Sequence, residues 1–87
     1  MTYVLNIASG GQTHEFAADN DYDAELQAIT ILADIGHIAP TVADDWTGDG
    51  YNDDGQLCER LLFWADDDAA ENDAGESAIA ELRVVRV

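Results

Sequence analysis

The chain has 87 residues, of which 19 are aspartate or glutamate and three are arginine, and its formal net charge at pH 7 is -16. A chain of this length forms one small domain that buries only about 60% of its unfolded surface, which leaves little room for a deep catalytic cleft. Nucleic acid and anionic membranes both repel so acidic a protein. We therefore expect residues 1–87 to form a single compact acidic domain that binds neither of them directly.

The hydrophobic residues, 47% of the chain, occur in periodic clusters and predict a folded protein. The single cysteine, Cys58, excludes an internal disulfide and fits a reducing compartment. The start, MTYVLNIASGG, contains neither the basic region of a signal peptide nor an apolar run that could span a membrane. We expect a cytoplasmic protein, located in the bacterial host cell if a phage encodes it.

The first predicted element is a β-hairpin. Residues 2–9 are rich in β-branched and aromatic side chains, GGQ at 10–12 is a turn signal, and THEFAA resumes the alternation of a strand. The apolar side chains expected on its buried face are Tyr3, Leu5, Ile7 and Phe16.

A helix is predicted next. It begins at an Asp or Asn cap within residues 19–21, is acidic near its N-terminus, and ends at Gly36, with Pro40 preventing continuation. The apolar stripe expected to cover the sheet consists of Tyr22, Leu26, Ile29 and Ala33, with Leu32 and Ile35 alongside.

The segment GQLCERLLFWADD fits two periods. Leu57 and Leu61 have helical spacing, whereas Leu62 and Trp64 alternate as in a strand. We favour a strand, because Phe63 and Trp64 have high β propensity and a strong strand candidate follows.

That candidate is SAIAELRVVRV, in which Ala80, Leu82 and Val84 face one way and Glu81 and Arg83 the other. The acidic connector before it, DDDAAENDAGE, is expected to contain a helical turn. The predicted fold is α+β: a four-stranded antiparallel sheet in β-β-α-β-β order with one helix packed on one face.

The segment DWTGDGYNDDGQ, from Asp45, resembles the calcium loop of EF-hand and dockerin-like proteins. Gly50 stands where that loop needs a tight turn, but Asn52 replaces the apolar residue at position eight and Gln56 the bidentate acid at position twelve. We therefore favour a solvated turn and expect no cofactor. The calcium ligands that the resemblance implies are Asp45, Thr47, Asp49 and Asp53, with the main chain of Tyr51.

No motif predicts catalysis. His14 and His37 are far apart in the sequence, and neither lies in a zinc or nucleophile motif with Cys58. We expect no catalytic residues and no enzyme activity.

The negative charge is concentrated, since residues 44–76 hold 12 of the 19 acidic residues and only one basic residue, Arg60. Such self-repulsion destabilises a small fold and suggests a positively charged partner, for which carboxylates could replace the phosphates of DNA while aromatic residues anchor the contact. The candidate partner-binding surface is Asp44, Asp45, Trp46, Asp49, Tyr51, Asp53, Asp54, Asp66, Asp67, Asp68, Glu71, Asp73 and Glu76.

With its short length, very low pI, α+β pattern and lack of a catalytic motif, the chain resembles the small acidic inhibitors of phages and mobile elements, in particular anti-CRISPR proteins that imitate DNA. The resemblance covers the whole chain, rests on no specific motif and assigns no residue roles. It implies that the partner is the basic DNA-binding surface of a CRISPR-Cas surveillance complex.

The acidic composition also fits a halophilic protein or a generic interaction domain. Absent lysine, Asp in excess of Glu and many alanines are typical of a halophilic protein, although a high-GC genome favours the same residues. A generic acidic interaction domain that binds another basic protein would differ from a DNA mimic only in its target.

Overall fold

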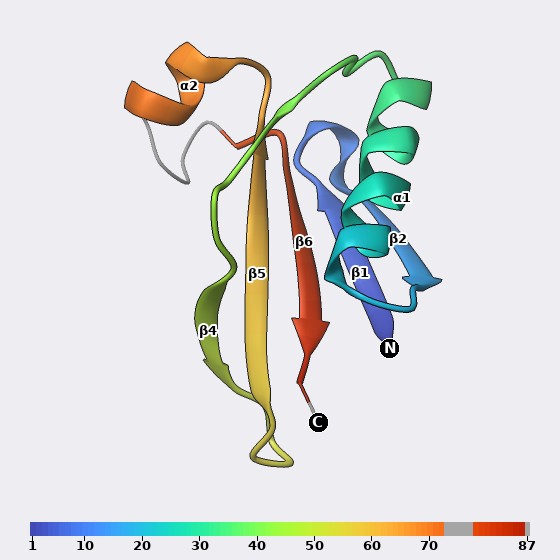
Figure 1. The fold of residues 1–87 in the computed structure, drawn as a ribbon, viewed down its shortest axis with the longest axis vertical. Helices are drawn as coiled ribbons and strands as arrows, with labels where there is room; N and C mark the ends of the chain where they lie inside the picture. The colour runs from blue at the N-terminus through green and yellow to red at the C-terminus, as the bar shows by residue number, and fades with distance from the viewer. Residues whose placement is uncertain (73–77, 87) are drawn as a thin grey trace.

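The computed structural model describes residues 1–72 and 78–86 and has an α+β architecture, with one main helix on one face of an antiparallel sheet (Figure 1). The predicted fold class is confirmed, but the expected four strands in β-β-α-β-β order are wrong, because the described residues form a sheet of six strands. The sheet order is β2 (Gln12–Ala17), β1 (Thr2–Ile7), β6 (Ala80–Val85), β5 (Leu57–Trp64) and β3 (Thr41–Val42), and β4 (Thr47–Tyr51) also pairs with β5.

The two unexpected strands, β3 and β4, lie in a stretch that has the composition of a loop, TVADDWTGDGY. Glycine and aspartate have low β propensity, so no local signal predicts strands there. They form because β5 offers an edge of backbone N–H and C=O groups that need partners. The N–H of Ala43, just after β3, also donates to the carbonyl of Leu62, at 2.9 Å.

The N-terminal hairpin is confirmed. Strands β1 and β2 pair in antiparallel fashion and are joined by a short 3-10 turn, η1 (Ser9–Gly11). Tyr3, Leu5 and Ile7 are buried on one face of β1, and the ring of Phe16 stacks on that of Tyr3 with centroids 6.1 Å apart.

The main helix, α1 (Asp21–Asp34), begins and ends where the sequence predicts. The side chain of Asn20 caps its N-terminus. Gly36, with φ at 102°, ends the helix, and the N–H of His37 donates to the carbonyl of Leu32 in a Schellman arrangement.

The rotation of α1 about its axis differs from the prediction. The residues that α1 buries against the sheet are Ala24, Ala28 and Leu32, whereas Tyr22 is 69% exposed and Leu26 is 46% exposed. The predicted stripe is therefore wrong in part: Leu32 is buried and Ile29 packs against the core as expected, whereas the exposed members are Tyr22, Leu26, Ala33 and Ile35. The buried face of α1 thus consists of two small alanines and one leucine, which pack in the core cluster with the residues of the sheet.

The core lies between α1 and the sheet. Leu5, Leu82 and Leu61 are neighbours across β1, β6 and β5 and are almost fully buried. A second helix, α2 (Asp67–Asn72), confirms the helical turn expected in the acidic connector and packs at one end of β5, opposite the β4–β5 turn (Figure 1). No helix in the described ranges is long and apolar enough to cross a membrane.

Candidate functional site

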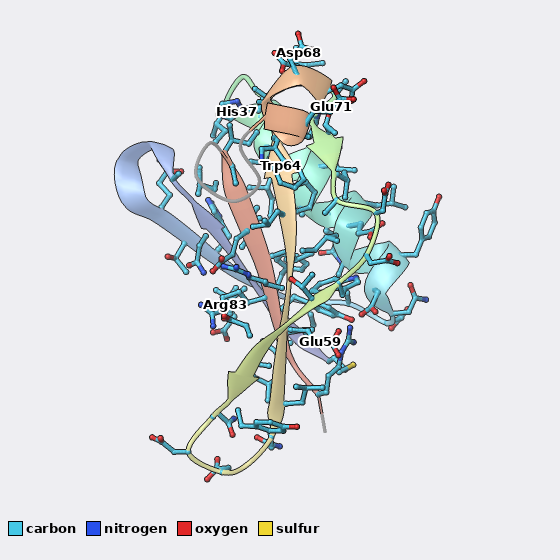
Figure 2. All side chains as sticks on the ribbon, turned by 90° about the vertical axis from the view of Figure 1, so that its left-hand side faces the viewer. His37, Glu59, Trp64, Asp68, Glu71 and Arg83 are labelled. Atoms are coloured by element: carbon cyan, nitrogen blue, oxygen red, sulfur yellow. The ribbon has the colours of Figure 1, made fainter. Side chains whose placement is uncertain are left out.

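Three carboxylates from two separate segments border one groove of about 430 Å³ at the α2 end of the sheet. Asp44 follows β3, whereas Asp67 and Glu71 lie on α2. We call this the α2 groove and define it by these three residues together with Thr41 and Trp64, which also line it. Figure 2 shows Asp68 and Glu71 on α2 with Trp64 beside them.

Local hydrogen bonds hold α2 and its residue Asp67 in place. Asp66 accepts a hydrogen bond from the N–H of Ala69 at 2.9 Å and so caps the first turn of α2. The hydroxyl of Thr41 donates to Asp67 at 2.8 Å and ties α2 to β3. The fold thus places these carboxylates together with no cation between them in the described chain.

Trp64 is buried, but on the face of β5 opposite to the core residue Phe63. Its side chain is only 6% exposed, so it does not stand out as an anchor for a partner. Its indole N–H has no hydrogen-bond partner among the described residues. Trp64 supports α2 and gives the groove an apolar wall.

Three other residues of the predicted surface, Tyr51, Asp53 and Asp54, belong to a second cluster, the β4–β5 turn, which lies at the other end of the molecule (Figure 1). Asp53 and Asp54 are exposed there, and Tyr51 is 74% exposed. The side-chain oxygen of Asn52 accepts hydrogen bonds from the N–H groups of Asp54 and Gln56, at 3.1 and 2.9 Å, and shapes the turn.

The resemblance to a calcium loop does not extend to the geometry. Thr47 and Asp49 lie on strand β4, and the carboxylate of Asp49 pairs with Arg83. Gln56, at the closing position, accepts a hydrogen bond from the amide of Asn52 at 3.1 Å. Across residues 1–72 and 78–86, no three metal-ligating side chains converge.

Trp46 and Asp49 do not join the exposed carboxylates. The ring of Trp46 packs against Tyr3, with centroids 6.1 Å apart, and the guanidinium of Arg86 lies 5.2 Å from its centre. Three other residues of the predicted surface are exposed and are close in sequence to residues of the α2 groove: Asp45, Asp66 and Asp68. The last two, Asp73 and Glu76, lie outside the described residues.

A partly buried network of hydrogen bonds and ion pairs joins the start of α1 to the end of β6. Arg86 donates to both oxygens of Asp21, at 2.8 and 2.9 Å, and Tyr3 donates to the same carboxylate at 2.8 Å. The hydrogen bonds from Arg86 hold the pKa of Asp21 below its ordinary value, and burial, followed by the hydrogen bond to Asp21, raises the pKa of Tyr3 to about 12. Burial and the charge of Asp21 raise the pKa of Glu25.

All three arginines are engaged in ion pairs with carboxylates of the fold. None of these pairs involves the α2 groove or the β4–β5 turn. The ion pairs are Arg60–Glu81, Arg83–Glu81, Arg83–Asp49, Arg86–Asp21 and Arg86–Glu59. Both exposed clusters therefore keep their full negative charge within the described chain.

Acid should weaken the stabilisation that Asp21 provides. A carboxyl group whose pKa is lowered by folding stabilises the fold above its unfolded pKa, here 3.8, and loses this contribution as the pH falls through the folded value. The advantage of the wild type over Asp21→Asn in unfolding free energy should therefore shrink by about 1 kcal/mol between pH 6 and pH 2.5, a small value because the carboxylate is 38% exposed.

Urea denaturation at a series of pH values measures this difference. Asp34→Asn, which removes an exposed carboxylate from the other end of α1, controls for the change of net charge. An advantage over Asp21→Asn that stays constant down to pH 2.5 would contradict the role assigned to Arg86.

Two features of the site are missing from the sequence-based prediction. Thr41 orients Asp67 from 26 residues away, and Arg86 holds Asp21 from 65 residues away. No local pattern marks either pair, because both depend on which strands become neighbours.

Comparisons of the chain with protein-family models, with curated proteins and with solved structures find no match.

Proposed function

We propose that this protein binds the basic, nucleic-acid-binding surface of another protein and so competes with DNA for it. The observation that carries the proposal is the α2 groove, which Asp44, Asp67 and Glu71 border from two segments of the chain with no ion pair to a described arginine. Gathering like charges costs stability, so a positively charged partner explains the arrangement.

The shape of the molecule supports the same proposal. Its longest axis is 36 Å, with α2 at one end and the β4–β5 turn at the other (Figure 1). About ten base pairs of duplex DNA, at ~3.4 Å each, span this length. Carboxylates at both ends, with Asp44 and Asp45 between β3 and β4, could occupy a groove that tracks a phosphate backbone.

The specific form of the proposal is an inhibitor of the anti-CRISPR type, which blocks DNA recognition by a CRISPR-Cas surveillance complex. The target has a basic channel for duplex DNA, which acidic side chains can fill. The interaction should be fast and sensitive to salt, because charge dominates it.

The experiment measures displacement of a fluorescent matching duplex from a guide-loaded surveillance complex at ~0.15 M salt, where the Debye length is about 8 Å. We expect displacement by micromolar protein. The variant Asp44→Asn/Asp67→Asn/Glu71→Gln should compete at least about tenfold more weakly, since each amide keeps the shape of the side chain and removes its charge.

The matched control is Glu15→Gln/Asp19→Asn/Asp34→Asn, which removes three exposed carboxylates away from the α2 groove and should compete within about threefold of the wild type. Equal loss in both variants would mean that net charge alone acts. Failure to displace DNA from the surveillance complex would overturn the anti-CRISPR form of the proposal. In that case, a melting temperature that rises steeply in multimolar salt would favour a halophilic protein.

A further inference from the structure

The sheet has a second face, which is turned away from α1. Side chains alternate along each strand, so the neighbours of the core residues point to this side. Figure 2 shows Arg83 on this side of the sheet and Glu59 on the side of α1. We call it the open face and define it by Val4 and Asn6 of β1, Cys58, Arg60 and Leu62 of β5, and Glu81, Arg83 and Val85 of β6.

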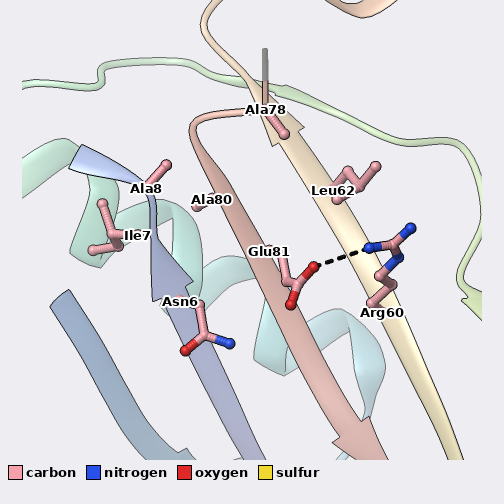
Figure 3. A pocket seen from close by; sticks show the side chains of 8 residues that line it. All are labelled: Asn6, Ile7, Ala8, Arg60, Leu62, Ala78, Ala80 and Glu81. Atoms are coloured by element: carbon pink, nitrogen blue, oxygen red, sulfur yellow. Dashed lines mark hydrogen bonds and ion pairs between the residues drawn. The ribbon is translucent and has the colours of Figure 1, made fainter. Parts of the chain in front are cut away.

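Two hollows lie on the open face. One, of about 320 Å³, is lined mostly by apolar groups, among them Val4, Cys58 and Val85. The other, of about 250 Å³, is lined by Leu62 and the Arg60–Glu81 pair, with α1 behind the strands (Figure 3). Val85 is 40% exposed, so an apolar group remains open to solvent in the hollow that it shares with Arg83.

The charge of the open face differs from that of the rest of the chain. A row of alternating charges crosses it from β4 to β6, in which Arg60 and Arg83 pair with Glu81 and Asp49. Two arginines balance two carboxylates, so the row is neutral in a protein whose net charge is -16. Two of the chain's three arginines are used here.

We infer that the open face is the interface of a homodimer. Two copies that meet through acidic surfaces repel each other, whereas a neutral row of arginine and carboxylate groups is self-complementary across a two-fold axis: Arg83 of one copy can face Glu81 of the other. A strongly basic partner would prefer the exposed carboxylates of the α2 groove to this neutral row. The second copy is therefore the occupant that the charges favour.

The dimer buries the open face in a sheet-on-sheet contact. Stacked sheets lie about 10 Å apart, and the side chains of Val4, Leu62 and Val85 would fill the space between them. The β4–β5 turn and α2 lie at the ends of the sheet, so each copy in the dimer keeps both of its acidic clusters accessible (Figure 1). This inference does not depend on the proposed function.

Sedimentation velocity of the full chain, from roughly 1 to 200 µM, tests the dimer. We expect the average mass to rise from that of one 9.4 kDa chain toward twice that value. The rise should begin at lower concentration in about 0.5 M salt than in ~0.15 M, because salt screens the repulsion between two acidic chains. Binding to a basic partner should respond to salt in the opposite direction. A mass that stays monomeric over this whole range at both salt concentrations overturns the inference.

Two variants test the surface. Val85→Asp adds a charge to the open face and should keep the protein monomeric throughout. Leu26→Asp makes a similar change on the exposed side of α1, where the residue is 46% exposed, and should leave the dimer intact. Dimerisation that survives Val85→Asp but not Leu26→Asp would move the interface to α1 and overturn the inference.

A second measurement needs no variant. Cys58 is the only cysteine in the chain and lies on the open face, so its reaction with a thiol reagent reports on this surface alone. The rate should fall by about fivefold or more between the lowest and highest protein concentrations as dimers form. A rate that is independent of concentration contradicts the proposed interface even if the protein dimerises.

Discussion

Replacing Leu82 with alanine should lower the free energy of unfolding by about 3 kcal/mol. Leu82 is fully buried on β6 and lies between Leu5 and Leu61 of the adjacent strands. The alanines of α1 that cover this region are too small to fill the space that the substitution leaves. The variant thus loses both the burial of the side chain and the contacts around the cavity.

Urea denaturation followed by circular dichroism measures this loss. The matched control is Leu26→Ala, the same substitution at a position that is 46% exposed on α1, which should change stability by less than about 0.5 kcal/mol. A small domain is marginally stable, so the Leu82 variant should unfold at a much lower urea concentration. Similar losses in the two variants would contradict the assigned orientation of α1.

Replacing Arg86 with alanine should cost about 2 kcal/mol. The substitution removes a two-pronged ion pair with Asp21, a second pair with Glu59 at 3.5 Å, and the contact of the guanidinium with the ring of Trp46. It also leaves Tyr3 as the remaining side-chain donor to the partly buried carboxylate of Asp21. The start of α1 then loses its tie to the end of β6.

The control for Arg86→Ala is Arg60→Ala. Arg60 is 40% exposed and, among the described residues, pairs only with Glu81, which keeps its second partner, Arg83. This variant should lose less than about 0.5 kcal/mol, as is usual for exposed ion pairs. If both arginine substitutions cost the same, the effect would reflect the loss of one positive charge from an acidic chain and not the network around Asp21.

These two predictions concern the part of the molecule that keeps the acidic clusters in place. The arginines neutralise carboxylates that lie on or against the sheet, whereas those of the α2 groove and the β4–β5 turn stay unpaired in the described chain. Stability and the proposed binding therefore depend on different acidic residues. Amide substitutions in the α2 groove should accordingly weaken competition with DNA without unfolding the protein.

Several elements could be predicted because their signals are local. The alternation of Ala80, Leu82 and Val84 identifies a strand and its buried face, and Gly36 identifies the end of α1. The same local reasoning fails for α1's rotation, since Tyr22 and Leu26 form a plausible apolar stripe but are exposed. Which face of a helix is buried depends on how closely it can approach the sheet.

The candidate site, too, has some features that local sequence signals predict and others that depend on tertiary contacts. The concentration of acidic residues in the middle of the chain predicts a charged surface, but not that Asp44 and Glu71 border one groove while Asp53 lies apart from them in the β4–β5 turn. Only the tertiary structure also shows which of the aromatic residues are exposed and which are buried. Tyr51 is exposed, whereas Trp46 packs against the core beside Tyr3 and Trp64 is buried near α2.

By itself, the sequence determined the α+β class, the N-terminal hairpin, the limits of α1 and the strong negative charge, because periodicity, caps and composition act over a few neighbouring residues. The tertiary structure alone decided that β3 and β4 join the edge of β5, that Arg86 holds Asp21, and that the acidic residues divide into two clusters. These outcomes depend on contacts between residues far apart in the chain, whose free energy no local pattern records.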